Sequence, residues 1–235
     1  FVSASLDHTC ALADGELFCW GNNFSGNLGD GTKESKFTPT RIGTDNDWDI
    51  ISAGSCTCGI RSGELYCWGS NYYGQLGDGT TDNKITPTRI GTENDWKTVS
   101  NSISTTCGIR SGKLFCWGNN MYGQLGTGNT TDSLVPLQIG TDSDWESIGA
   151  KAYSTCGIKS GELYCWGANI LDINNGSDYS PVKIGTHNDW TNISVGAFYF
   201  CGVRNDEFYC WGNNSDGQLG NGGAWELTPV PVIEP

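Results

Sequence analysis

The chain has 235 residues, enough for one sizeable domain, and it is rich in glycine (34) and tryptophan (10). Its formal net charge of −13 argues against binding to nucleic acid, which needs basic patches, and against attachment to anionic membranes. No apolar stretch approaches the roughly 20 residues of a membrane-spanning helix, so we expect no membrane insertion.

Short apolar runs between glycine-rich turns favour an all-β protein. Position 1 is Phe1, with neither an initiator methionine nor a signal-peptide pattern, which favours a processed chain. One unit then recurs five times: a cysteine, eight residues, a second cysteine, and Trp-Gly. The cysteine pairs are Cys10 and Cys19, Cys58 and Cys67, Cys107 and Cys116, Cys156 and Cys165, and Cys201 and Cys210. The steps between the Trp-Gly tryptophans are 48, 49, 49 and 45 residues, a period that indicates a repeat architecture.

The spacing within each pair predicts a β-hairpin. A two-residue turn at Asp14-Gly15 places Cys10 opposite Cys19, at a pair position where side chains approach closely. The same count places the other turns at Ser62-Gly63, Ser111-Gly112, Ser160-Gly161 and Asn205-Asp206. We therefore predict five disulfides, one per hairpin, and with them an oxidising, extracellular compartment. The alternative is five pairs of buried free thiols; a zinc site is disfavoured because the spacing does not match.

Eleven cysteines leave Cys56 without a partner in its hairpin. An odd cysteine in a secreted protein suggests an intermolecular bond or a free thiol, and a buried inert thiol is the alternative.

Each unit has the same order: an Asp-Trp turn, a strand, the cysteine hairpin, a glycine-punctuated loop and a strand that contains proline. About four short strands in such a period is the size of one β-propeller blade. The units span residues 1–47, 48–95, 96–144, 145–189 and 190–235 of a single domain. Because the first segment matches the start of a unit and the last matches its end, we expect the terminal segments to share one blade and remove exposed sheet edges.

The segment from His8 to Gly29 resembles the repeat of the regulator of chromosome condensation family. The motif Trp-Gly-x-Asn-x-x-Gly-Gln-Leu-Gly is almost complete in repeats two, three and five, so the resemblance covers nearly the whole chain. It implies a propeller of four-stranded antiparallel blades: five blades if the chain is complete, or part of the seven-bladed ring that is usual in the family. The paired cysteines and acidic charge are more similar to secreted or receptor-ectodomain members than to nuclear ones.

The variable pair inside the loop motif is the candidate binding site. Large apolar residues on a turn often mark a binding surface, although they could instead cover the neighbouring blade. These candidates are Phe24, Tyr72, Tyr73, Met121, Tyr122, Ile170 and Leu171. Repeat four lacks Gln-Leu-Gly after Ile170-Leu171, which is either a specialised loop or a tolerated deletion.

We find no pattern of catalytic residues: His8 and His187 lie at non-equivalent positions of different repeats. The Asp45-Asn-Asp47 turn resembles part of a calcium loop but lacks its glycine and glutamate, so no metal or cofactor is predicted. Five Asn-x-Ser/Thr sequons give possible glycosylation sites at Asn23, Asn129, Asn175, Asn192 and Asn213.

These features predict an extracellular, non-enzymatic binding or scaffold propeller that binds a protein partner or assembles with copies of itself. A multivalent carbohydrate-binding lectin is one alternative, because repeated aromatic, Asn-rich loops could present several equivalent sites. An enzyme with a site in the central channel is another.

Overall fold

The computed structural model describes residues 1–168, 177–223 and 225–232 of the chain. Within these ranges the ordered elements are twenty β-strands, which form five antiparallel four-stranded sheets. This confirms the predicted all-β architecture of five four-stranded blades. No helix in the described part of the chain has the length and apolarity of a membrane span.

Each sheet is built from four consecutive strands. The first contains β1 (Val2–Ala4), β2 (His8–Ala13), β3 (Glu16–Gly21) and β4 (Lys36–Arg41). The second contains β5 (Trp48–Ala53), β6 (Cys56–Arg61), β7 (Glu64–Gly69) and β8 (Lys84–Arg89). The third contains β9 (Trp96–Asn101), β10 (Thr105–Arg110), β11 (Lys113–Gly118) and β12 (Ser133–Gln138). The fourth contains β13 (Trp145–Lys151), β14 (Ser154–Lys159), β15 (Glu162–Ala168) and β16 (Ser177–Lys183). The fifth contains β17 (Trp190–Val195), β18 (Tyr199–Arg204), β19 (Glu207–Gly212) and β20 (Glu226–Pro231).

The central hairpin of each blade has the predicted register. In the first blade Ala13 pairs with Glu16 and Cys10 pairs with Cys19. Both turn residues, Asp14 and Gly15, have positive φ (52° and 77°), which is the conformation of a tight hairpin turn. Gly15 is also required sterically, because a Cβ there would lie 2.0 Å from the carbonyl oxygen of Asn46.

All five predicted disulfides are present, which confirms the pairing. They join Cys10 to Cys19, Cys58 to Cys67, Cys107 to Cys116, Cys156 to Cys165, and Cys201 to Cys210. Each spans two adjacent strands whose Cα atoms are 4.0–4.1 Å apart. That separation is typical of the closely spaced, non-hydrogen-bonded pairs of an antiparallel ladder.

The apolar core lies between blades. Four clusters of buried residues each join one face of a blade to the facing side of the next blade. Between the first two blades the cluster combines Leu17 and Leu28 with Trp48 and Trp68, and the two indole rings meet edge to face with centroids 5.9 Å apart. Since each blade covers its neighbour, the tryptophans that recur with the period act as core residues.

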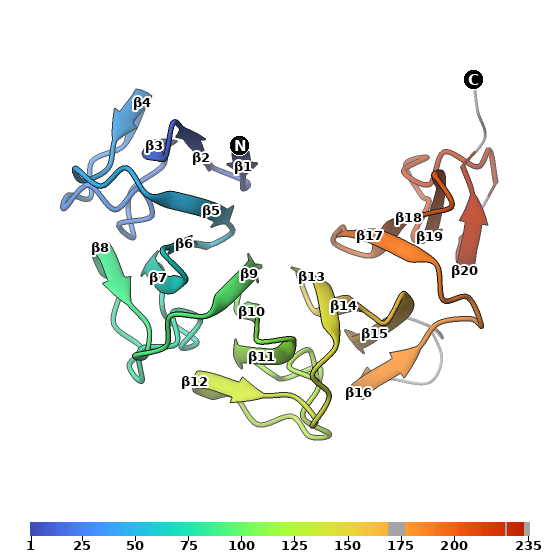
Figure 1. The fold of residues 1–235 in the computed structure, drawn as a ribbon. Helices are drawn as coiled ribbons and strands as arrows, with labels where there is room; N and C mark the ends of the chain where they lie inside the picture. The colour runs from blue at the N-terminus through green and yellow to red at the C-terminus, as the bar shows by residue number, and fades with distance from the viewer. Residues whose placement is uncertain (169–176, 224, 233–235) are drawn as a thin grey trace.

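The five blades lie on an arc around a common axis, with the innermost strands β1, β5, β9, β13 and β17 nearest that axis (Figure 1). The first and last blades stand at the two ends of this arc (Figure 1). The expectation that the terminal segments share one blade is therefore wrong: β1 belongs to the sheet of β2–β4, and β20 to that of β17–β19. Each unit already contains four strands, so no strand is left to close a blade from the other end of the chain.

Candidate functional site: the loop face

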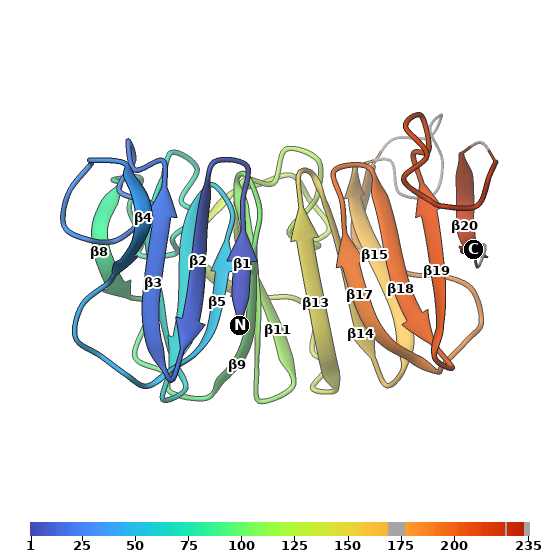
Figure 2. The same ribbon diagram turned by 90° about the horizontal axis from the view of Figure 1, so that it is seen from above.

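The loops that follow the Trp-Gly motif lie on one side of the propeller. The first and third strands of a blade run in the same direction, so the turn after the first and the loop after the third emerge on the same side (Figure 2). We call this side the loop face. The hairpin turns and the Asp-Trp turns emerge on the opposite side (Figure 2).

A buried asparagine holds each described loop in shape. Asn120 donates from Nδ2 to Thr127 Oγ1 (3.1 Å) and to the carbonyls of Asn129 (2.9 Å) and Thr131 (3.0 Å). Its Oδ1 accepts the Leu125 amide at 2.9 Å, and the side chain is completely buried. Three other loops begin with an asparagine whose Oδ1 accepts the amide of the equivalent leucine: Asn23, Asn71 and Asn214. The backbone of the loops is therefore fixed from inside, and their tips can vary without loss of shape.

The predicted candidate residues of the first three loops lie at these tips and face solvent. Their exposed fractions are 74% for Phe24, 71% for Tyr72, 48% for Tyr73, 59% for Met121 and 38% for Tyr122. Ile170 and Leu171 lie outside the described residues. Five large apolar side chains exposed on one side exceed the scattered singles that are normal on a surface.

A second row of apolar residues was not predicted from the sequence. It lies in the turns after the innermost strands, where Leu6, Ile103 and Phe198 are 91%, 45% and 50% exposed. Tyr153 of the fourth blade belongs to the same row, and its ring contacts the Tyr122 ring with centroids 4.9 Å apart. In the sequence, the only indication of this second row is an apolar residue beside each short polar turn. The row lies on the loop face because the first and third strands of a blade run in the same direction.

The opposite side has a different chemistry. In blades two to five a cation stacks on an aromatic ring of its own hairpin, as Arg110 does on Phe115 (4.9 Å to the ring centroid). The same cation pairs with carboxylates of the Asp-Trp turn: Arg110 with Glu93 (3.4 Å) and Asp95 (3.1 Å). A hydrogen bond from Ser111, reinforced by Arg110, lowers the pKa of Asp95. These carboxylates therefore serve to hold the turns.

The turn that resembled part of a calcium loop is held in the same way. Asp45 and Asp47 both pair with Arg61, and Asp47 accepts a hydrogen bond from Ser62. Across the described ranges, no three His, Cys, Asp or Glu side chains converge as a metal site would require.

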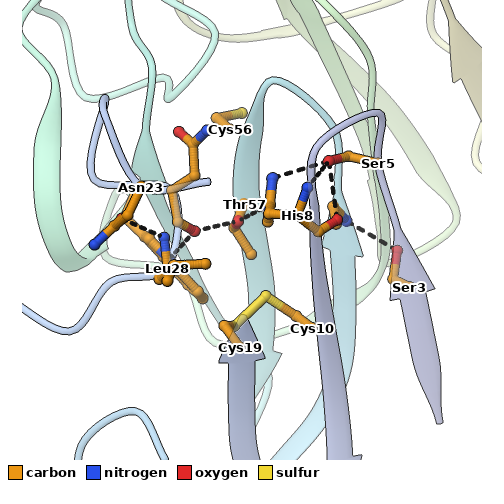
Figure 3. The surroundings of a disulfide bond; sticks show 12 residues. Ser3, Ser5, His8, Cys10, Cys19, Asn23, Leu28, Cys56 and Thr57 are labelled. Atoms are coloured by element: carbon orange, nitrogen blue, oxygen red, sulfur yellow. Dashed lines mark hydrogen bonds between the residues drawn. A yellow bond between two sulfur atoms is a disulfide. The ribbon is translucent and has the colours of Figure 1, made fainter. Parts of the chain in front are cut away.

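His8 lies between the first two blades and Cys56 between the second and third, and both side chains are buried. Figure 3 shows the surroundings of His8. His8 Nε2 is 2.9 Å from Thr57 Oγ1, and its Nδ1 is 2.8 Å from Ser5 Oγ. Burial lowers the pKa of His8, against the opposing effect of Asp7. Because Thr57 is completely buried, this chain of polar groups links two blades and presents no nucleophile to a substrate.

Cys56 is a free, completely buried thiol. Burial raises its pKa to about 11, and its Sγ lies 3.3 Å from Asn101 Nδ2. The suggestion that Cys56 joins two chains is not supported by this position, because a second chain could not reach the sulfur without opening the blade interface.

The sequons have different environments. Asn23 is completely buried, and its Nδ2 donates to Asp30 Oδ1 (3.0 Å) and to the carbonyls of Thr32 and Glu34. A glycan at Asn23 would destroy the loop, so that prediction is corrected. Asn129 and Asn192 are exposed and Asn213 is half-buried, whereas Asn175 lies outside the described residues.

The innermost strands surround a polar cavity of about 230 Å³ near the axis. Serines from four blades contribute to its wall, and the one titratable side chain in that wall is Lys151. A central site with a pair of acid–base groups, as the enzyme alternative needs, is not formed by these wall residues.

Comparisons with solved structures show which known proteins share this fold. Human WBSCR16 matches all of this chain with a TM-score of 0.88 at 24% sequence identity, and the match covers 67% of that protein. Yeast RCC1 (Prp20), solved bound to Kap60, matches all of the chain with a TM-score of 0.86 at 18% identity over 61% of its length. The ectodomain of the Physcomitrella patens receptor kinase CR4 matches 90% of the chain with a TM-score of 0.56 at 18% identity, over 53% of its length. The chain thus spans about two-thirds or less of these structures.

A comparison with curated proteins found no match. The family model of the regulator of chromosome condensation (RCC1) repeat matches residues 14–59, 62–109 and 111–157, which is more than half of the chain. Together with the five blades, this match shows that the chain belongs to the RCC1 repeat family.

Proposed function

We propose that this chain is an extracellular, non-enzymatic binding propeller whose loop face contacts a protein partner. The observation that carries the proposal is the set of exposed apolar side chains on rigid loops: Phe24, Tyr72, Tyr73, Met121 and Tyr122. Aromatic residues and methionine are enriched at the centres of protein interfaces, where a few of them supply most of the binding free energy.

The fixed loop backbone beneath these residues is better suited to binding than to catalysis. Because Asn71 and Asn120 fix the loop backbone, little conformational entropy is lost when the tips are covered by a partner. The titratable groups with altered pKa are committed elsewhere: His8 is buried between blades and Asp95 holds a turn. RCC1-like structures include Prp20p, which was characterised for its binding to Gsp1p and histones.

The extracellular location rests on the five disulfides, which persist in oxidising compartments. The match to a plant receptor ectodomain agrees with such a location but shares only the fold. An acidic partner is disfavoured by the charge of −13, so we expect a neutral or basic protein surface with an apolar centre.

The test is a binding screen of the folded chain against a library of secreted proteins and receptor ectodomains, with a glycan array in parallel. For a protein hit we expect the double variants Tyr72→Ser/Tyr73→Ser and Met121→Ser/Tyr122→Ser to weaken binding at least tenfold. Lys113→Ala, an exposed change on the opposite side, is the matched control and should leave the affinity unchanged. Hits that bind glycans alone, or protein hits insensitive to both double variants, would contradict the proposal.

A further inference from the structure

Grooves recur on the outer rim of the propeller, between the last strands of neighbouring blades. Within the described residues, three such grooves have volumes of about 350, 180 and 480 Å³ in chain order. Each is lined by three residues of its following blade: the tryptophan of the Asp-Trp turn, the cation that stacks on the hairpin, and the proline of the last strand. These residues are Trp48, Arg61 and Pro87, then Trp96, Arg110 and Pro136, and then Trp145, Lys159 and Pro181.

The groove between the third and fourth blades is the largest of these, and its chemistry differs from that of the others. In the first two blades, an arginine of the last strand pairs at 2.8 Å with a glutamate of the hairpin: Arg41 with Glu16, and Arg89 with Glu64. The third blade has Gln138 and Lys113 at these two positions. The wall of the largest groove therefore has an amide, from Gln138, where the first two blades have a guanidinium.

A second ion pair is replaced in the same way. In the first two blades, an aspartate of the loop pairs with a lysine that begins the last strand: Asp30 with Lys36 (3.4 Å), and Asp78 with Lys84 (3.1 Å). The third blade has Thr127 and Ser133 at these positions. Because Thr127 and Asn129 line the groove together with Gln138, the third blade contributes hydroxyl and amide groups to it.

The charged side chains of this wall are paired with each other. Lys159 Nζ lies 2.8 Å from Asp142 Oδ2 and 4.5 Å from the centroid of the Tyr164 ring. Asp142 and Lys159 are the charged residues among those that line the groove, so the wall carries no unbalanced charge. Ser180 of β16 adds an exposed hydroxyl on the side of the fourth blade.

The rest of the wall is apolar. Ile139 and Trp145 are almost completely buried, whereas Leu137 is 45% exposed and Pro181 is half-buried. A neutral sugar needs both kinds of surface, because its C–H faces pack against apolar atoms while its hydroxyls donate and accept hydrogen bonds. Amides and hydroxyls also do both, and a volume of 480 Å³ falls in the usual range of about 300–1,000 Å³ for small-molecule sites. We propose that the groove between the third and fourth blades binds a neutral oligosaccharide.

Two other classes of ligand fit this groove less well. An ionised ligand needs an unpaired charge of opposite sign, and Asp142 and Lys159 neutralise each other. An extended peptide would have to pair with the exposed edge of β12 or β16, which are the outermost strands of their sheets (Figure 1). Each of these strands contains a proline, Pro136 and Pro181 respectively, which removes an amide donor from the edge.

The oligosaccharide site is separate from the protein-binding surface proposed for the loop face. Met121 and Tyr122 belong to the loop that also supplies Thr127 and Asn129, but they are not among the residues that line the groove. The two sites can therefore be tested with different substitutions in the same protein.

The test begins with the folded chain on an array of neutral and acidic glycans. The array carries both free linear oligosaccharides and the glycans of glycoproteins, so it distinguishes these two sources. Titration calorimetry then uses maltotriose, cellotriose, mannotriose and triacetylchitotriose as neutral probes, with trigalacturonate as the acidic counterpart. We expect saturable binding of a neutral glycan at one site per chain, with a change in tryptophan fluorescence because Trp145 lies in the wall.

Two substitutions of exposed residues should remove this binding. Gln138→Ala should weaken it about tenfold through the loss of hydrogen bonds to the sugar, and Ser180→Trp should abolish it by filling the groove. Arg89→Ala, at the position of Gln138 in the second blade, is the matched control and should leave the sugar affinity unchanged. Thermal unfolding of each variant confirms that it is folded.

The outcomes separate this site from the proposed protein contact. Met121→Ser/Tyr122→Ser should leave the sugar affinity unchanged, and Gln138→Ala should leave the affinity for a protein partner unchanged. The absence of any neutral glycan among the bound ligands would overturn the inference, and so would a preference for acidic glycans. Sugar binding that survives both Gln138→Ala and Ser180→Trp would assign the sugar to another surface.

Discussion

Reduction of the five disulfides is expected to unfold the protein. Each bridge joins cysteines nine positions apart. In the chain-entropy model, a loop of this length destabilises the unfolded state by about 2.6 kcal/mol. Five bridges together contribute on the order of 13 kcal/mol, which is comparable with the net stability of roughly 5–15 kcal/mol of a typical domain. The interblade cores alone should therefore leave the reduced chain at or beyond the limit of folding.

The measurement is thermal unfolding followed by circular dichroism and tryptophan fluorescence, with and without reductant. We expect the oxidised protein to unfold cooperatively and the fully reduced protein to show no transition. The double variant Cys107→Ala/Cys116→Ala removes one bridge and should lower Tm by about 5–10 °C, given about 2–4 °C per kcal/mol for a domain of this size. Treatment with an alkylating agent but no reductant is the control, because the remaining thiol, Cys56, is buried.

A reduced protein that melts cooperatively within a few degrees of the oxidised one would refute this reasoning. The hairpins would then be held by their ladders and by interblade packing alone. A fold that is stable without its disulfides would also be stable in a reducing compartment, so the disulfides would no longer indicate an extracellular location.

Three further predictions concern single residues. Asn120→Ala should cost about 3 kcal/mol in denaturant unfolding and speed hydrogen exchange in its loop, because the carbonyls of Asn129 and Thr131 lose their donor and the buried Leu125 amide loses its acceptor. Cys56 should resist iodoacetamide at pH 8 in the native protein and react fully after unfolding, because burial raises its pKa to about 11. Burial also lowers the pKa of His8, so as the pH falls the histidine is protonated in the unfolded state at a higher pH than in the folded state. The free energy of unfolding should therefore be constant above about pH 6.5 as far as His8 is concerned and decrease below it. His8→Thr should remove the part of this decrease that His8 causes.

The sequence predicts the hairpins and disulfides because their determinants are local. The Asp14-Gly15 turn and the period-two alternation of a strand fix which residues face each other, so Cys10 meets Cys19 without knowledge of the rest of the fold. The exposure of Phe24, Tyr72 and Met121 followed from the same kind of argument, since the glycines around them require turns.

The features that the sequence did not predict depend on how blades meet. The number of blades in a closed ring is set by the angle at each interblade cluster, such as that of Leu17 with Trp48, and a repeat period does not encode an angle. The apolar turn residues Leu6, Ile103 and Phe198 lie on the loop face only because the first and third strands run in the same direction. Asn23 matches a sequon by pattern, yet its buried amide is committed to the loop.

Within a few residues, the loop motif separates the side chains that hold the loop from those that face solvent. Asn120 and Leu125 are buried and hold the backbone of their loop, while Met121 and Tyr122 between them are exposed and make no contribution to that clamp. Two other loops have the same division, with Asn23 and Leu28 around Phe24, and Asn71 and Leu76 around Tyr72-Tyr73. Substitutions at the tips should therefore change what the protein binds at little cost to folding, whereas substitutions one position earlier should remove the surface altogether. A repeat of this kind can present a different set of side chains on each blade because the shape of the loop does not depend on them.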